Sequence, residues 1–155
     1  MPKTQKRRRR QAKTDYKARL ALLKSEKPRV VVRKTNRYIL AQIVESKLAQ
    51  DKVITRVSSK DLLQKGWPKE KKGSLKNLQA AYLTGFLLAK KTKIKEAILD
   101  TGLQRNISGS RIYAFLKGAV EAGLKIPHSK ESLPTDERLN KNEKLKDLLS
   151  IKEKL

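Results

Sequence analysis

Alternating apolar and polar positions predict four short strands. Arg29–Thr35 and Arg37–Glu45 are rich in Val and Ile, and Asn36, a residue that tolerates a positive φ, stands between them as a tight turn. Lys52–Ser58 follows a short polar loop and has a similar strand-like composition. The apolar stretch Ala97–Asp100 has the length of an inner strand. The first three strands are expected to form a meander.

Helical spacing of apolar residues predicts a first helix near the N-terminus. Thr14 can cap this helix, because its hydroxyl can accept a hydrogen bond from the first turn. Lysines occupy one face of it, and the other face is formed by Tyr16, Leu20 and Leu23. The helix is therefore expected to be amphipathic, with a cationic side.

A second helix is expected to be the most buried element. Ser74 can cap it, and its wide apolar stripe consists of Leu75, Leu78, Tyr82, Leu83, Phe86, Leu87 and Ala89. Gly85 costs roughly 1 kcal/mol in a helix interior, and a close approach to the sheet would explain its presence. A third helix is predicted to begin after Ser108 or Ser110 and to end before Pro127.

These elements together predict an α/β fold of the α+β type. Since a helix joins the third strand to the fourth, some parallel pairing is expected in a small mixed sheet of about four strands. The helices are expected to pack on one face and to leave the other face open. We predict a basic arm at residues 1–13, a single domain at 14–137 and a charged tail at 138–155, in which a marginal helix could form around Leu145, Leu148 and Leu149.

The charge of the chain points to a polyanionic partner. The formal net charge is +24, and residues 1–37 hold 15 Lys and Arg against two acidic residues. The chain has no cysteine, which excludes disulfides and thiolate metal sites. No secretory signal is recognised, and the longest apolar stretch, Ala80–Ala89, is too short to span a bilayer. A soluble cytoplasmic protein is expected.

The N-terminal arm is the first candidate for nucleic-acid binding. Its arginine run repels itself and buries nothing, so the free arm is expected to be disordered. Its cations can neutralise phosphates and release counterions, and they are Lys6, Arg7, Arg8, Arg9, Arg10 and Lys13. The alternative is a solubilising tail or a localisation signal.

The predicted sheet offers a second candidate surface. With the apolar faces of the first two strands turned toward the helices, Arg29, Arg33, Tyr38 and Gln42 are expected on the open face. Guanidinium planes and aromatic rings stack on unpaired bases, which suits RNA. A solvated antiparallel face of the same composition is equally compatible with the pattern. In the turn, Asn36 and Arg37 are candidates for RNA contact, although a purely conformational role for Asn36 fits as well.

Other features carry weaker signals. Backbone amides in the loop Asn106–Arg111 could bind an anion at the start of a helix, but a plain capped loop is the commoner structure. Trp67 is either a base-stacking residue or part of a cluster under a loop. His128 is the only histidine, so no metal site is predicted, and no nucleophile–base pair or phosphate-cradling loop indicates an enzyme. No cofactor is expected.

Four stretches in order resemble the universal large-subunit ribosomal proteins number eighteen, in their archaeal form. They are KPRVVVRKTNRYILAQIV (27–44), NLQAAYLTGFLLAKK (77–91), EAILDTGLQR (96–105) and GSRIYAFLKGAVEAGLKIPHS (109–129). The likeness runs from about Arg7 to Glu137. The loop at 106–108 departs from the basic or proline-containing loop of archaeal members, and the tail after Arg138 matches no part of the family.

The resemblance implies a structural constituent of the large ribosomal subunit without catalysis. It implies binding to 5S ribosomal RNA and its attachment to the large-subunit (23S-type) RNA in the central protuberance, beside protein number five and its neighbours there. The residues that match the family's RNA-binding arm and first helix are Arg7–Arg10, Lys13, Tyr16 and Arg19. Those that match its RNA-facing strands, turn and loop are Arg29, Arg33, Lys34, Asn36, Arg37, Tyr38, Gln42, Ser110 and Arg111. A DNA-compacting architectural protein and a nucleic-acid-processing enzyme are the alternatives.

Overall fold

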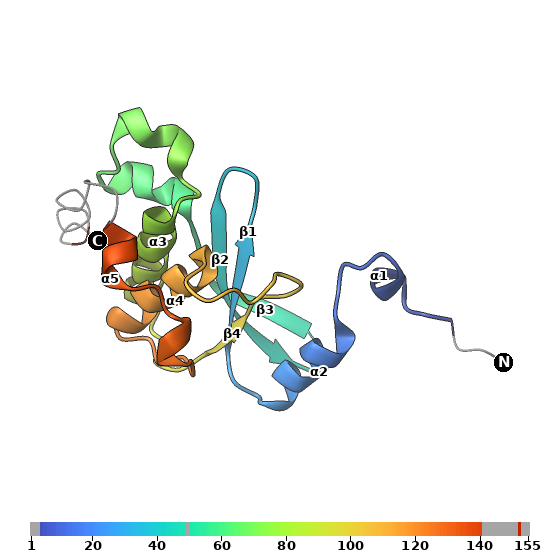
Figure 1. Cartoon of the computed structure of the whole chain (residues 1–155). Helices are drawn as coiled ribbons and strands as arrows, with labels where there is room; N and C mark the ends of the chain where they lie inside the picture. Colours follow the sequence, from blue (N-terminus) through green and yellow to red (C-terminus); the bar gives the residue numbers. More distant parts are fainter. Residues whose placement is uncertain (1–3, 49, 141–151, 153–155) are drawn as a thin grey trace.

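The computed structural model of the chain describes residues 4–48, 50–140 and 152, and its centre is a mixed four-stranded sheet (Figure 1). The strands are β1 (Arg29–Lys34), β2 (Ile39–Lys47), β3 (Gln50–Ser58) and β4 (Ile98–Asp100). Their order is β3-β2-β1-β4, with antiparallel pairs throughout the meander and β4 parallel to β1. The predicted meander, the fourth strand and the parallel pairing are confirmed.

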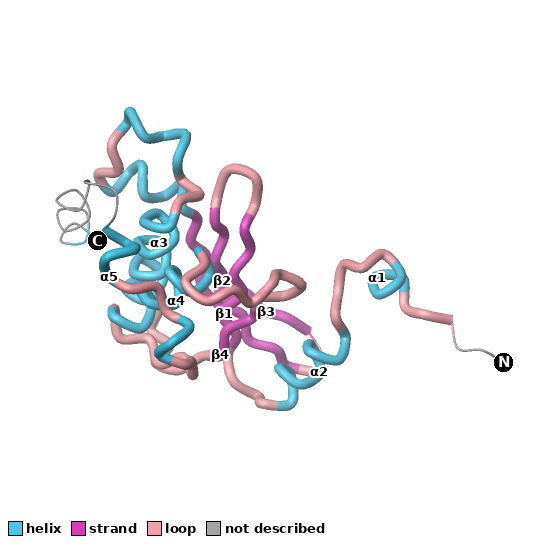
Figure 2. Tube along the Cα trace, viewed as in Figure 1, coloured by secondary structure: helices cyan, strands magenta, loops and turns pink. Residues whose placement is uncertain are grey.

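Two helices cover one face of the sheet, as expected (Figure 2). α3 (Leu78–Lys91) packs against β2, β3 and α4 (Arg111–Glu121). Three shorter helices lie nearer the ends of the chain, and they are α1 (Arg7–Arg10), α2 (Tyr16–Lys24) and α5 (Asp136–Asn140). None of the described residues of α1 or α2 is buried. The helix predicted around Leu145 lies outside the described residues.

The core lies between the sheet and the α3–α4 pair. Val30 and Val32 of β1 are 0% and 1% exposed, and the alternate residues of β2 are buried beside them. Trp67, 5% exposed, belongs to the same cluster, so the base-stacking interpretation of this residue is wrong. In the sequence, Trp67 stands between two 3₁₀ helices, Ser59–Lys65 and Lys69–Ser74.

Two helix starts differ from the prediction. α2 is capped by Asp15, whose carboxylate accepts hydrogen bonds from the amides of Lys17 and Ala18, and not by Thr14. α3 is capped by Asn77 and not by Ser74, because a 3₁₀ helix already occupies the residues up to Ser74. Side-chain capping depends on backbone geometry that sequence spacing alone does not give.

Gly85 marks a close approach between two helices, not between a helix and the sheet. A Cβ at Gly85 would lie 2.0 Å from the carbonyl oxygen of Phe115 in α4. The contact is reciprocal, because a Cβ at Gly118 would lie 2.0 Å from the carbonyl oxygen of Tyr82 in α3. The expected contact with the sheet is therefore wrong, and the glycines instead allow the two backbones to touch.

The turn between β1 and β2 is held by a side chain. The Thr35 hydroxyl donates to the Tyr38 carbonyl at 2.8 Å and accepts from the Tyr38 amide at 2.9 Å. The expected positive φ at Asn36 is wrong, since the non-glycine residues with positive φ in the described chain are Ala12, Glu26 and Leu48. Asn36 and Arg37 are exposed at the tip of this turn.

No helix in the described ranges combines the length and the apolar character needed to cross a membrane.

Candidate nucleic-acid interface

The sheet face opposite α3 and α4 carries a network of ion pairs centred on Arg29. Its guanidinium donates to Asp100 at 3.1 Å, to Asp51 at 2.8 Å and to Ser46 at 2.9 Å. The side chain is only 3% exposed. The expectation that Arg29 lies on an open, RNA-facing surface is therefore wrong, because two carboxylates from β3 and β4 enclose and neutralise it.

Asp51 ties α2 to this network. Arg19 of α2 donates to the second carboxylate oxygen of Asp51 at 2.9 Å. Burial alone would raise the pKa of Asp51, but hydrogen bonds from Ser46 and Arg19 and the charge of Arg29 outweigh it and hold the pKa below its ordinary value of 3.8. The open face of the sheet is thus bounded at one end by α2.

Arg33 stands four residues along β1 from Arg29, on the same face of the sheet, and is much more accessible. It donates to the Asp100 carboxylate at 3.0 Å and to the Asp100 carbonyl at 2.8 Å, yet its side chain is 41% exposed. Gly102, with φ +62°, lies under the guanidinium, and a Cβ there would come within 2.9 Å of it. Arg33 is therefore held in place while part of its guanidinium faces solvent.

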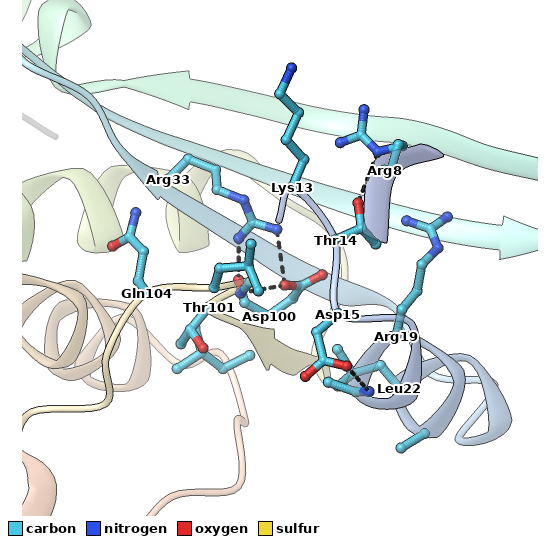
Figure 3. Close-up of a pocket in the computed structure, with 15 residues that line it drawn as sticks. Arg8, Lys13, Thr14, Asp15, Arg19, Leu22, Arg33, Asp100, Thr101 and Gln104 are labelled. Atoms are coloured by element: carbon cyan, nitrogen blue, oxygen red, sulfur yellow. Dashed lines mark hydrogen bonds and ion pairs between the residues drawn. The ribbon is translucent and has the colours of Figure 1, made fainter. Parts of the chain in front are cut away.

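The arm, α2, β1 and the loop after β4 enclose a groove of about 620 Å³, here called the arm groove (Figure 3). Four of its lining residues are cations, namely Arg8, Lys13, Arg19 and Arg33. Two are carboxylates, Asp15 and Asp100, of which Asp15 caps α2 and Asp100 pairs with Arg33. Thr14 and Gln104 add polar groups to the wall. The groove is therefore cationic and open to a ligand with several acceptors.

Local contacts fold the arm toward this groove. The Arg8 guanidinium donates to the Thr14 hydroxyl at 2.8 Å, across a turn in which Ala12 has a φ of +50°. The Lys6 ammonium lies 4.7 Å from the centre of the Tyr16 ring, within the range of a cation–π contact. These contacts connect the arginine run to α2.

A second groove of about 810 Å³, here called the α4 groove, lies beside the start of α4. Its cations are Lys34, Arg105, Arg111 and Arg138, and no carboxylate is among its described lining residues. Ser110, at the N-cap of α4, lines it as well. Gln104 lines both grooves, so the loop that follows β4 forms the wall between them.

The structure distributes the sequence-predicted residues over several places. It brings Arg8, Lys13, Arg19 and Arg33 together in the arm groove, and Lys34, Ser110 and Arg111 in the α4 groove. The remaining arm residues Arg7, Arg9 and Arg10 are exposed on α1. Gln42 is half-buried on the sheet, and Tyr38 is half-buried and packs against the core, so its ring is less free for stacking than expected.

The groove residues that were not predicted from the sequence include Gln104, Arg105 and Arg138. They come from a loop and from a helix at the end of the described domain. The sequence indicated only that Arg105 is a basic residue in a glycine-containing loop that precedes a helix. Among the described residues no cluster of three or more His, Asp or Glu side chains could hold a metal ion.

Comparisons with known proteins agree on one family. The family model described as "Ribosomal large subunit proteins 60S L5, and 50S L18" matches residues 2–97 and 90–129. Large ribosomal subunit protein uL18 of Korarchaeum cryptofilum is 54% identical over 136 residues, which cover 86% of this chain and 68% of that protein. The uL18 proteins of Methanospirillum hungatei and Aeropyrum pernix are 50% and 47% identical, over 85% and 86% of this chain and 75% and 62% of their own.

The family model covers every described residue of the arm groove and those of the α4 groove except Arg138, which lies beyond residue 129. The resemblance expected from the four sequence blocks is confirmed, as is its archaeal character. The chain belongs to the family of the ribosomal large subunit proteins 60S L5 and 50S L18.

Proposed function

We propose that this protein is a structural constituent of the large ribosomal subunit that binds 5S ribosomal RNA. It helps to attach that RNA to the large-subunit RNA in the central protuberance, in the cytoplasm, beside protein number five. It has no catalytic role. The family supports the assignment to the large subunit, because the relatives that match over most of the chain carry that name.

The arm groove is the observation that supports RNA binding most directly. Cations of the arm, α2 and the sheet meet there on one surface, although they are far apart in the sequence. Arginine offers a planar fork to phosphate oxygens and stacks on unpaired bases, and structured RNA presents both. The exposed turn with Asn36 and Arg37 extends the cationic surface along β1 and β2.

Binding should depend steeply on salt. If about eight phosphates are contacted, log K should fall with log salt at a slope of about −6 to −7, by analogy with other nucleic acids. A complex whose affinity does not change with salt would contradict a phosphate-binding surface.

A competition assay tests the choice of RNA. Labelled 5S ribosomal RNA is bound at about 150 mM salt, where exposed charges are screened beyond roughly 8 Å, and is displaced by transfer RNA or duplex DNA of equal phosphate number. We expect unlabelled 5S RNA to displace the labelled RNA at much lower concentration than transfer RNA or duplex DNA does. Equal competition by all three would mean that the protein contributes charge alone, and would favour a DNA-compacting role.

A further inference from the structure

The α4 groove has more uncompensated charge than the arm groove. In the arm groove two carboxylates offset four cations, whereas the described lining of the α4 groove holds four cations and no carboxylate. None of Lys34, Arg105, Arg111 and Arg138 forms an ion pair with a described carboxylate. Like charges that lie close together without a counter-charge repel each other. A bound anion would relieve this repulsion, so the groove favours anion binding.

The start of α4 adds donors to the same groove. Ser110 occupies the N-cap position, but its side chain accepts no hydrogen bond from the first turn. Its Oγ has almost no solvent access and no partner among the described residues. The first-turn amides of Arg111, Ile112 and Tyr113 likewise have no acceptor within the described chain. An anion at this helix start would accept hydrogen bonds from these amides. After a rotation of χ1 it would also accept one from the Ser110 hydroxyl.

Arg138 is placed beside these amides by a glycine. Gly109 has a φ of +66°, and a Cβ there would come within 2.7 Å of the Arg138 guanidinium. The guanidinium therefore lies against the backbone just before Ser110. Gly102 and Arg33 form the same arrangement in the arm groove, so the loop after β4 carries one such pair on each side.

α5, which carries Arg138, is anchored to the core. Leu139 is 6% exposed within the core cluster, and its carbonyl accepts from Gln79 of α3 at 3.2 Å. Lys117 of α4 donates to Pro134 at 3.0 Å and to Asp136 at 2.6 Å. Arg138 is thus held at the groove before any ligand arrives, which lowers the entropic cost of binding.

We propose that the α4 groove binds a backbone phosphate of the same RNA, through Arg105, Arg111, Arg138 and the first-turn amides of α4. This inference rests on the proposed function, and it adds α5 and the second side of the loop after β4 to the RNA-binding surface. The RNA would contact the protein on both sides of that loop, with phosphates in the arm groove and in the α4 groove. The assignment gives Arg138, at the start of the charged tail, a role that the sequence did not suggest.

The test compares two double variants of equal charge in the full chain. Arg105→Gln with Arg138→Gln removes two groove cations, and Lys60→Gln with Lys130→Gln removes two exposed cations outside both grooves. The groove variant should bind 5S RNA at least about tenfold more weakly than the control, because charge-assisted hydrogen bonds are lost as well as charge. For the groove variant, the slope of log K against log salt should be shallower by about 1 than for the control variant. Circular dichroism confirms that both variants fold.

The outcomes separate this inference from the proposed function. If the natural protein prefers 5S RNA but the two double variants bind it equally, the α4 groove is not a phosphate site and the proposed function stands. If the natural protein shows no preference for 5S RNA, a titration with inorganic phosphate, followed by amide nuclear magnetic resonance, decides the inference alone. Saturable shifts at Gly109–Tyr113 that the groove variant loses support an anion site, and their absence overturns it.

Discussion

Arg29 and Arg33 lie four residues apart on β1 and point to the same face of the sheet, but their surroundings differ. Arg29 is enclosed by Asp51 and Asp100, whereas Arg33 shares Asp100 and keeps 41% of its side chain exposed. Alternation along the strand predicts which face a side chain points to. It does not predict the carboxylates on that face, because Asp100 is 71 residues away from Arg29 in the sequence.

Replacing these two arginines should lower the stability of the protein by unequal amounts. Arg29→Ala should lower the free energy of unfolding by about 3 kcal/mol, at the low end for a broken buried ion pair, because Asp100 keeps Arg33 as a partner. Arg33→Ala, the matched control, should cost about 1 kcal/mol or less, since that pair is partly exposed. Urea denaturation measures both values. Equal losses would contradict the assignment of Arg29 to the structure.

Asp51 should make the stability of the protein sensitive to acid. Its pKa is lower in the folded chain than in the unfolded chain, so its contribution is fully present above the unfolded pKa and is lost as the pH falls through the folded one. Asp51→Asn should therefore destabilise the protein at pH 7. Urea denaturation as a function of pH should show the difference from the natural protein shrinking below about pH 4. A difference that stays constant down to acid pH would contradict the network.

At the scale of elements, the crossing of α3 and α4 depends on two glycines. Val and Ile alternation and helical periodicity predicted the strands and the main helices, since both patterns follow from backbone repeats. The partner of Gly85 was not predictable, because periodicity shows which face of a helix is buried but not which element covers it. The cap of α3 is Asn77 and not the predicted Ser74, because the 3₁₀ helix Lys69–Ser74 determines where α3 begins. Periodicity does not predict such a helix.

Gly85→Ala should be destabilising even though alanine favours helix. The new methyl group would overlap the Phe115 carbonyl, and overpacking of this kind costs about 1–3 kcal/mol or more. Gly73→Ala is the matched control, because a Cβ at that position has no neighbour within 4 Å. Thermal denaturation should show a clearly lower Tm for the first variant alone. A Tm unchanged by Gly85→Ala would mean that the helices do not touch there.

At the scale of the whole molecule, the cations that line the two grooves come from the arm, α2, β1, the loop after β4, α4 and α5. The sequence predicted the arm and much of the arm groove, because a run of arginines and a resemblance are visible in linear order. It did not predict Gln104, Arg105 and Arg138 as groove residues, because folding brings the loop after β4 beside α5, which lies more than 30 residues further along the chain. The folded surface, rather than the arm alone, is therefore expected to determine the specificity for 5S RNA.

Deleting residues 1–13 tests this expectation most directly. The variant retains Asp15, so α2 keeps its cap, and the sheet and both core helices are untouched. The quantity to measure is the ratio of affinities for 5S ribosomal RNA and transfer RNA, for the full chain and for the shortened chain, at equal salt. The affinity should fall, because the arm supplies phosphate contacts, but the ratio should persist. A ratio that falls to one would show that the arm alone recognises 5S RNA, and would contradict a role for the folded face.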